Sequence, residues 1–241
     1  ATTEVSVFGG HNVPRVIADY SQVGIYEHDD LKPIGHFYLP ATDKWAMNDL
    51  GADFVYTGQR PSTFMLPMGL KEIVDYKIWL EKNCPENLFP MIAFEEISDS
   101  VKTHNSLNFI TINIDNLKPE LIPSLASLKE AVLVISTNNT HGMPALRRFF
   151  FELISQGIKF PVVIWRQYEA MSTSDFQLFS ATDLGGLLVD GLGDGTILSV
   201  PKNTLAADFQ GLAKIYNSTA FGILQAARTR MSKTEYISCP S

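Results

Sequence analysis

A terminal cysteine and a glycine-rich loop carry the residue types best suited to chemistry in this sequence. Cys239 is followed by Pro-Ser and has the form of the first half of a C-x-x-C pair. Two thiolates three positions apart can reach one metal ion or cluster. Cys84 stands beside Pro85 without such a pattern, and we expect it to be a structural or idle thiol. Two cysteines in 241 residues make no disulfide framework, which indicates a reducing compartment.

The glycine-rich loop spans Asp190–Gly195 and follows an apolar run at 186–189 that we interpret as a strand. Gly191, Gly193 and Gly195 permit left-handed backbone and close approach, so their amides could hold a phosphate. Late loops of α/β barrels often do this. Against this reading, the loop contains two carboxylates and no Lys or Arg. A structural turn and a phosphate site therefore both stay open.

Histidines and paired carboxylates give weaker signals. The five histidines, at positions 11, 28, 36, 104 and 141, show no metal-binding spacing. His141 follows a predicted strand, where a barrel enzyme places catalytic groups, but a solvated loop histidine is the alternative. Glu95, Glu96 and Asp99 also follow a strand, and adjacent carboxylates on a loop are usually solvated. No Ser-His-Asp, Walker or dinucleotide signature is present.

Apolar runs alternate with amphipathic segments along the second half of the chain, which predicts repeated βα units. The runs at 131–135, 161–165 and 186–189 are typical of strands covered on both faces. A helix ending at Gly157 and a last helix over 204–229 each show an apolar stripe. The inward residues predicted for these helices are Leu146, Phe149, Phe150, Leu153 and Ile154, then Leu205, Phe209, Leu212, Tyr216 and Ala220.

The first half gives further strands at 16–18, 53–56, 89–94 and 108–114, and a helix at 69–82 with Leu70, Ile73, Val74 and Ile78 inward. Residues 20–50 are expected to be an irregular elaboration of the first unit. About eight strands alternating with helices predict an α/β fold, a closed (β/α)₈ TIM-like barrel. An open doubly wound sheet is the alternative. No linker divides the chain, so we expect one domain over 1–233 and an exit strand at its end, within 234–241.

Composition excludes several classes of function. The chain is 45% hydrophobic and carries a net charge of −7, which argues against a nucleic-acid partner. No apolar stretch approaches the ~18 residues of a membrane span. No N-terminal segment has the form of a signal peptide.

Two segments resemble a known family. Arg228–Ser241 (RTRMSKTEYISCPS) resembles the approach to the cluster domain of 4-hydroxy-3-methylbut-2-enyl diphosphate synthases, the iron–sulfur enzymes of the methylerythritol phosphate route to isoprenoids. Ala181–Gly195 (ATDLGGLLVDGLGDG) resembles their three-domain form, in which an insert separates an N-terminal barrel from a C-terminal cluster domain. The resemblance is strong over 181–241 and fair over 143–165.

The resemblance implies that this chain is the insert domain, a degenerate copy of the parent's catalytic barrel, since that barrel carries a similar Asp-Gly-x-Gly-Asp loop. The parent is implied to use a [4Fe–4S] cluster, with ferredoxin or flavodoxin as electron donor, in the bacterial cytoplasm or a plastid. Cys239 is implied to be the first cluster ligand in the full-length protein only. The expected role of the insert is a spacer without catalytic residues, inactive when isolated. The alternatives are a self-contained barrel enzyme acting at Asp190–Gly195 and His141, and a docking module for the electron donor.

Overall fold

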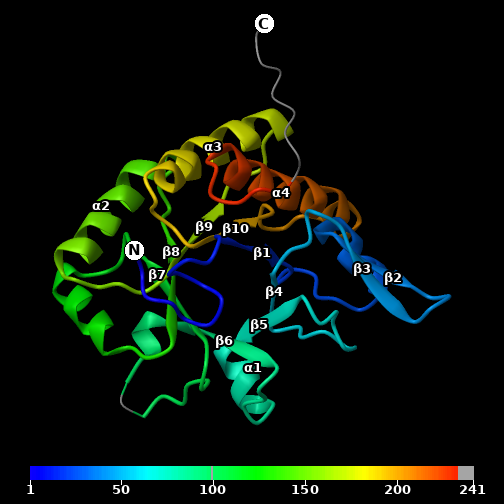
Figure 1. Ribbon diagram of the computed structural model, residues 1–241, viewed down its shortest axis with the longest axis horizontal. Helices are drawn as coiled ribbons and strands as arrows, with labels where there is room; N and C mark the ends of the chain where they lie inside the picture. The colour runs from blue at the N-terminus through cyan, green and yellow to red at the C-terminus, as the bar shows by residue number, and fades with distance from the viewer. Residues whose placement is uncertain (99, 233–241) are drawn as a thin grey trace, which may run out of the picture.

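Eight parallel strands close into a single barrel, which confirms the predicted (β/α)₈ class (Figure 1). The structure is a computed structural model that describes residues 1–98 and 100–232. Around the barrel the order is β1-β10-β9-β8-β7-β6-β5-β4, and β4 closes onto β1. The barrel strands are β1 (Arg15–Asp19), β4 (Phe54–Gly58), β5 (Lys71–Asp75), β6 (Leu88–Ala93), β7 (Asn108–Asn113), β8 (Ala131–Ser136), β9 (Val162–Gln167) and β10 (Gly195–Ser199).

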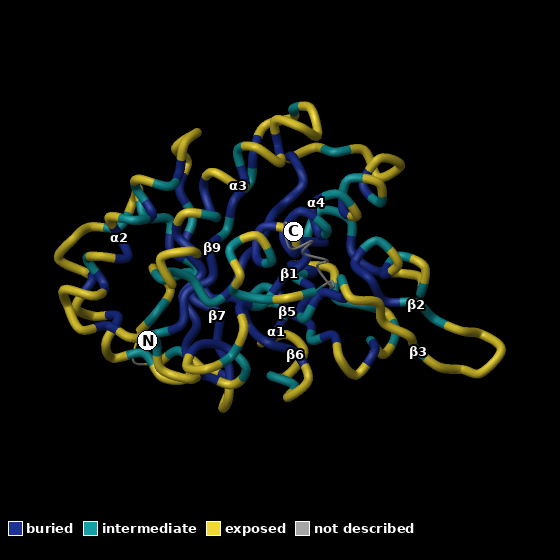
Figure 2. Tube along the Cα trace, turned by 45° about the horizontal axis from the view of Figure 1, so that its top comes forward, coloured by how far each residue is buried: buried dark blue, intermediate teal, exposed yellow. Residues whose placement is uncertain are grey.

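Alternation along the strands separates an inner core from an outer one. Inside the barrel, aromatic and branched side chains such as Ile17, Phe54, Phe109 and Ile197 pack together. The intervening strand residues face the helices and form a second, larger cluster. Figure 2 shows the barrel strands as the buried centre of the molecule.

The N-terminal segment plugs the barrel at the end where its strands begin. Val5 and Phe8 pair in an antiparallel bridge and belong to the inner core. The ring of Phe8 lies 5.2 Å from that of Phe54 and 5.6 Å from that of Phe109. Residues 1–14 therefore form part of the fold, although no sequence pattern marks them.

The helical shell is thick on one side and thin on the other. Three long helices, which cover the β8–β9–β10–β1 side, are α2 (Met143–Ser155), α3 (Thr173–Val189) and α4 (Ala206–Ala226). On the opposite side, the described residues of the connections form α1 (Tyr76–Glu81) and the short 3₁₀ helices η2 (Phe94–Glu96) and η3 (Pro119–Ser127) and no helix longer than these. The barrel is thus a reduced version of the regular (β/α)₈ plan.

The predicted strand at 186–189 is wrong, because α3 runs through it to Val189. Leu184, Leu187 and Leu188 are buried at helical spacing, and the paired glycines 185 and 186 do not break the helix. The helix ends where Gly191 adopts a φ of 73° and the Leu192 amide donates to the Leu187 carbonyl. The eighth barrel strand is β10, which begins only at Gly195.

The predicted helix at 69–82 is also wrong, since residues 71–75 form β5 and only 76–81 are helical. β-Branched Ile73 and Val74 are fully buried in this strand. The elaboration at 20–50 is an ordered unit, with η1 (His28–Ile34) and an antiparallel hairpin, β2 (His36–Leu39) and β3 (Lys44–Met47). The hairpin projects from the body in Figure 2.

Most of the predicted inward residues are buried. In α2 the buried side chains are Leu146, Phe149, Phe150 and Leu153, whereas Ile154 is 58% exposed. In α4 Phe209, Tyr216 and Ala220 are buried, whereas Leu205 precedes the helix and is 70% exposed. Each error lies at the end of a predicted stripe: Ile154 is in the last turn of α2, and Leu205 precedes the first turn of α4.

The predicted exit strand within 234–241 and Cys239 lie outside the described residues, so the 1–233 boundary stays a prediction. Among the described helices, none combines the length and hydrophobicity that crossing a membrane requires.

Candidate functional site

The C-terminal ends of the strands carry a ring of inward-facing side chains, which we call the mouth ring. Each member lies two residues after an inner-core residue of its strand, and so faces the same side of the sheet. Barrel enzymes hold their catalytic groups at this end. The ring consists of Asp19, Tyr56, Asp75, Ala93, Thr111, Ser136, Trp165 and Ser199.

Asp19 is the most buried acid of the mouth ring and is surrounded by donors. One carboxylate oxygen accepts from the Ser21 amide at 2.9 Å and the Ser21 hydroxyl at 2.7 Å. The other accepts from the Ser199 hydroxyl, whose oxygen in turn accepts from the Trp165 indole at 2.6 Å. Burial raises the pKa of Asp19, although the hydrogen bonds from Ser199 and Ser21 oppose this. The charge of Asp75 raises the pKa further.

Tyr56 and Asp75 form the second polar pair of the ring. The Tyr56 hydroxyl donates to the Asp75 carboxylate at 2.5 Å, and its ring meets that of Trp165 edge-on at 5.8 Å. Burial and the hydrogen bond to Asp75 both raise the pKa of Tyr56, so its hydroxyl keeps its proton at neutral pH. The ring therefore joins two carboxylates with hydroxyl and indole donors.

None of the mouth-ring residues is Lys or Arg. A cavity of about 500 Å³ opens beside the ring, over the ends of β8 and β9. Its wall contributes one exposed cation, Lys202, while Arg166 is buried and paired. Diphosphate sites gather several cations or a metal ion around the anion. The mouth does not have that composition, and its two carboxylates repel an anion.

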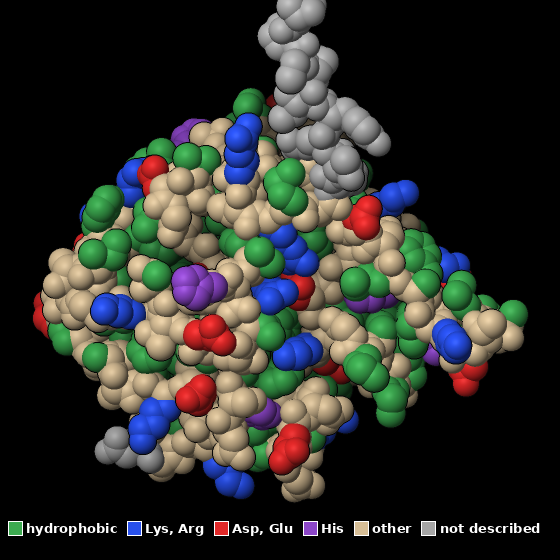
Figure 3. All heavy atoms as spheres, viewed as in Figure 1, with side chains coloured by type: hydrophobic (Ala, Val, Ile, Leu, Met, Phe, Trp, Pro, Cys, Tyr) green, Lys and Arg blue, Asp and Glu red, His purple; other side chains and the backbone are tan. Residues whose placement is uncertain are grey.

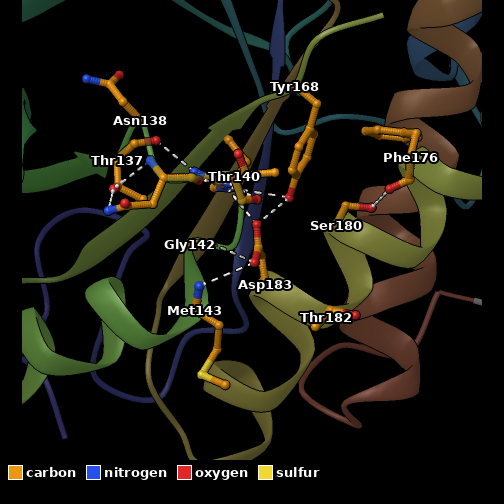
Figure 4. Close-up of polar contacts among 12 residues, drawn as sticks. Thr137, Asn138, Thr140, Gly142, Met143, Tyr168, Phe176, Ser180, Thr182 and Asp183 are labelled. Atoms are coloured by element: carbon orange, nitrogen blue, oxygen red, sulfur yellow. Dashed lines mark hydrogen bonds and ion pairs between the residues drawn. The ribbon is translucent and has the colours of Figure 1, made fainter. Parts of the chain in front are cut away.

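Behind the mouth, a buried ion pair fixes the loop that leads into α2 (Figure 4). Arg166 and Asp183 are each 2% exposed, and Arg166 Nε lies 2.9 Å from Asp183 Oδ2. The guanidinium also donates to the carbonyls of Thr137 and Asn139, each at 2.7 Å. Asp183 Oδ1 accepts from the Gly142 amide at 2.9 Å. A Cβ at position 142 would lie 2.8 Å from the Arg166 guanidinium carbon, so a larger residue there would displace the guanidinium from its partners.

The Asp190–Gly195 loop lies at the opposite end of the barrel from the predicted place. It follows helix α3 and precedes β10, so it belongs to the end where strands begin. Asp190 pairs with Arg147 at 2.5 Å. Asp194 accepts from the Val162 amide at 2.9 Å and the Thr2 hydroxyl at 2.8 Å. Both carboxylates thus already have partners within the fold, and phosphate binding at Gly191, Gly193 and Gly195 stays a prediction.

The other predicted candidates do not converge on the mouth ring. His141 is exposed and contacts the ring of Phe179. Glu95 and Glu96 are exposed on η2, and Asp99 lies outside the described residues. Cys84 is a half-buried free thiol. Within residues 1–98 and 100–232, no group of three or more His, Cys, Asp or Glu side chains could hold a metal ion.

Sequence reasoning missed Asp19, Asp75 and the buried pair of Arg166 with Asp183. A signal for the first two exists, because each is an acid that ends an apolar run, in Val16–Asp19 and Ile73–Asp75. No local pattern indicates that Arg166 and Asp183 meet.

The class of protein defined by this geometry is a (β/α)₈-barrel domain in which both mouth carboxylates are hydrogen-bonded to other side chains of the ring. No family model matches the chain.

Nearly the whole chain is similar to enzymes named 4-hydroxy-3-methylbut-2-en-1-yl diphosphate synthase (flavodoxin). It is 33% identical over 237 residues to that of Parabacteroides distasonis, which covers 98% of this chain and 34% of the relative. It is 29% identical over 241 residues to that of Phocaeicola vulgatus, which covers 99% of this chain and 34% of the relative. A chloroplastic synthase (ferredoxin) of Oryza sativa subsp. japonica is 39% identical over 98 residues, or 40% of this chain and 12% of the relative.

The chain therefore spans about a third of the length of its first two relatives. These homologues confirm the resemblance to the synthase, and the extent of the match fits the middle domain of the larger enzyme.

Proposed function

We propose that the chain is a structural spacer domain of a 4-hydroxy-3-methylbut-2-enyl diphosphate synthase. The parent enzyme reductively converts 2-C-methyl-D-erythritol 2,4-cyclodiphosphate to 4-hydroxy-3-methylbut-2-enyl diphosphate in the methylerythritol phosphate pathway. Flavodoxin or ferredoxin is its electron donor, as the names of the relatives support. In this proposal the barrel contributes no catalytic residue and sets the distance and angle between the catalytic barrel and the cluster domain.

The observation that carries the proposal is the composition of the mouth ring. Asp19 and Asp75 supply negative charge where a barrel would receive the cyclodiphosphate, and no Lys or Arg of the ring offsets it. The donors that could bind a substrate oxygen, such as Tyr56 and Ser199, already donate to these carboxylates. Substrate binding there would cost those hydrogen bonds and bring like charges together.

The described residues also do not fit a [4Fe–4S] cluster, since Cys84 is the one thiol among them and a cluster takes several thiolates. In this proposal, the described part of the domain therefore takes no part in the chemistry of the cluster. Cys239, beyond the described residues, is proposed as the first cluster ligand of the full-length protein.

The positions of the terminal segments support a spacer role. Thr3 donates its amide to the Lys159 carbonyl at 2.6 Å, just before β9. Near the other end of the described chain, Arg230 donates to the Pro14 carbonyl at 3.1 Å, just before β1. Both segments thus lie at the same end of a rigid barrel. Flanking domains attached through them would be fixed on one side of it.

A spacer role is tested by replacing residues 1–230 in the full-length synthase with a flexible Gly/Ser linker. We expect the iron content to be kept and the turnover of the cyclodiphosphate to fall at least tenfold, because the flanking domains lose their fixed geometry. Unchanged turnover would overturn the spacer role.

The absence of a catalytic role is tested by the double variant Tyr56→Phe/Asp75→Asn in the same full-length enzyme. We expect turnover within about twofold of the parent, whereas Cys239→Ser should abolish cluster assembly. A tenfold loss in a folded, iron-loaded double variant would favour the alternative of a barrel with its own substrate site. A barrel enzyme that uses the Asp190–Gly195 loop instead would have to bind phosphate at the end of the barrel where the strands begin.

A further inference from the structure

Two arginines share a single carboxylate at the end of the barrel where the strands begin, and a lysine lies on the neighbouring strand. Asp53, just before β4, lies 3.3 Å from Arg15 Nη1 through Oδ1 and 2.5 Å from Arg230 Nη1 through Oδ2. Arg230 makes a second hydrogen bond to Asp53 Oδ1 at 3.1 Å, so its contact is bidentate. Lys71 begins β5, the strand paired with β4, and Lys71 and Phe54 are register partners. We call Arg15, Lys71 and Arg230 the cationic row.

Lys71 is the member of the row that forms no ion pair with a carboxylate of the described residues. Its ammonium lies over the rings of Phe54 and Phe89, 5.6 and 5.7 Å from their centroids. Aromatic faces stabilise a cation only modestly. Burial lowers the pKa of Lys71, and the charge of Arg15 lowers it further. The side chain is therefore held partly desolvated and beside a like charge, an arrangement that an added anion would relieve.

The local charge contrasts with that of the whole chain. The protein carries a net charge of −7, yet the row brings three cations to this end of the barrel, of which Arg15 and Arg230 pair with Asp53 and Lys71 lies over the rings of Phe54 and Phe89. Figure 3 shows Lys and Arg side chains gathered near the middle of the visible face. The residues of the row are only partly buried, with Arg15 21% and Arg230 17% exposed, so a partner can reach them.

We propose that the cationic row is an interface that receives an acidic segment of the flanking part of the same polypeptide, one carboxylate of which pairs with Lys71. The inference rests on the proposed function, because a longer parent protein must supply that segment. The relatives are about three times as long as this chain, and both terminal segments lie at this end of the barrel. Tethering gives the attached parts a high effective concentration at the row, which a separate protein does not have.

Carbodiimide cross-linking of the full-length synthase tests the pairing directly. The reagent joins a lysine amine to a carboxylate in contact with it, and peptide mass spectrometry identifies both residues. We expect a link from Lys71 to an Asp or Glu outside residues 1–241, at a yield that does not fall on dilution. The variant Lys71→Arg keeps the charge but has no amine, so it should lose this link while its melting temperature stays within about 1 °C.

A second measurement detects the interface through its charge. In the full-length protein, Lys71→Glu should place two carboxylates face to face at the interface. The segments that connect this domain to the flanking parts should then be cleaved at least fivefold faster in limited proteolysis. Lys44→Glu, at an exposed lysine of the β2–β3 hairpin, is the matched control and should leave the rate unchanged.

The inference is overturned if Lys71 forms no link to a flanking residue, or if it links only to added flavodoxin, which would make the row a docking site for the electron donor. This outcome is separable from failure of the spacer role. The linker replacement and the mouth-ring variants report turnover, whereas the cross-link reports contact whether or not the enzyme turns over.

Discussion

The two ends of the barrel use charge in opposite ways. At the mouth, Asp19 and Asp75 receive hydrogen bonds from neutral Ser and Tyr donors, and the ring holds no cation. At the other end, Asp53 pairs with two arginines, and Lys71 pairs with no carboxylate among the described residues. In a barrel enzyme the first end does chemistry and the second serves stability. Among the described residues, the mouth carboxylates have no cation partner and Lys71 has no carboxylate partner, and it is at the second end that we propose this barrel meets the flanking part of its polypeptide.

The largest expected effect is the loss of the buried ion pair behind the mouth. Replacing Arg166 with Met leaves Asp183 buried without its countercharge and frees the loop before α2, so we expect the free energy of unfolding to fall by about 3–5 kcal/mol. Urea denaturation measures this. The control is Arg148→Met, which removes an exposed ion pair to Glu152 and should cost about 0.5 kcal/mol or less. A loss below about 1 kcal/mol for Arg166→Met would contradict our account of the cluster.

The next effect compares the two ends directly. Asp53→Ala removes the carboxylate that accepts from Arg15, Arg230 and the Val16 amide, and should cost about 2–3 kcal/mol. Asp75→Ala at the mouth removes one hydrogen bond from Tyr56 and should cost about 1 kcal/mol. Equal losses for the two variants, measured by the same denaturation, would remove the energetic distinction between the ends.

A smaller effect is expected from Gly193→Ala in the loop before β10. Gly193 has a φ of 106°, and an added Cβ would lie 3.1 Å from Ile164 Cδ1. We expect a loss of about 1–2 kcal/mol. Gly211, in α4, has no atom within 4 Å of an added Cβ, so Gly211→Ala should instead stabilise the protein by about 0.5–1 kcal/mol. If both variants shift the melting temperature the same way, the loop does not need glycine for its backbone.

The smallest effect concerns the pH dependence contributed by Asp19. Its pKa is raised in the fold, chiefly by burial, so the folded state binds this proton more tightly than the unfolded state does. The resulting stability is fully present below the unfolded pKa and is lost as the pH rises through the folded pKa. Asp19→Asn should remove this dependence. Denaturation curves of both proteins across the acid range should therefore show the parent losing stability relative to the variant as the pH rises, and parallel curves would refute it.

The barrel class could be predicted because six of its strands are apolar runs that local sequence marks. β5 and β10 could not be placed in the same way. The apolar residues Leu70, Ile73 and Val74 fit a helical spacing equally well, and Leu187–Leu188 has the composition of a strand while lying in α3. Only the pairing of neighbouring strands decides between such readings.

The site was less predictable than the fold. Asp19 and Asp75 can be recognised as mouth residues only once the bounds and pairing register of their strands are known, because these set which side chains face the barrel interior. The contact between Asp53 and Arg230 joins residues 177 positions apart, and nothing local in either segment indicates it. The glycines of 191–195 gave a clear signal, but misplacing one strand assigned them to the wrong end.

The closure of the barrel has a consequence for how the protein is made. β1 is hydrogen-bonded to β10 on one side, with Arg15 opposite Gly195, and to β4 on the other. During synthesis one edge of β1 therefore has no partner strand until β10, near the end of the domain, has been translated. Contacts of such long sequence separation form slowly, and an open apolar strand edge invites aggregation meanwhile. The link from Arg230 to Asp53 can form only after residue 230 has left the ribosome, so it is among the last contacts of the domain to form.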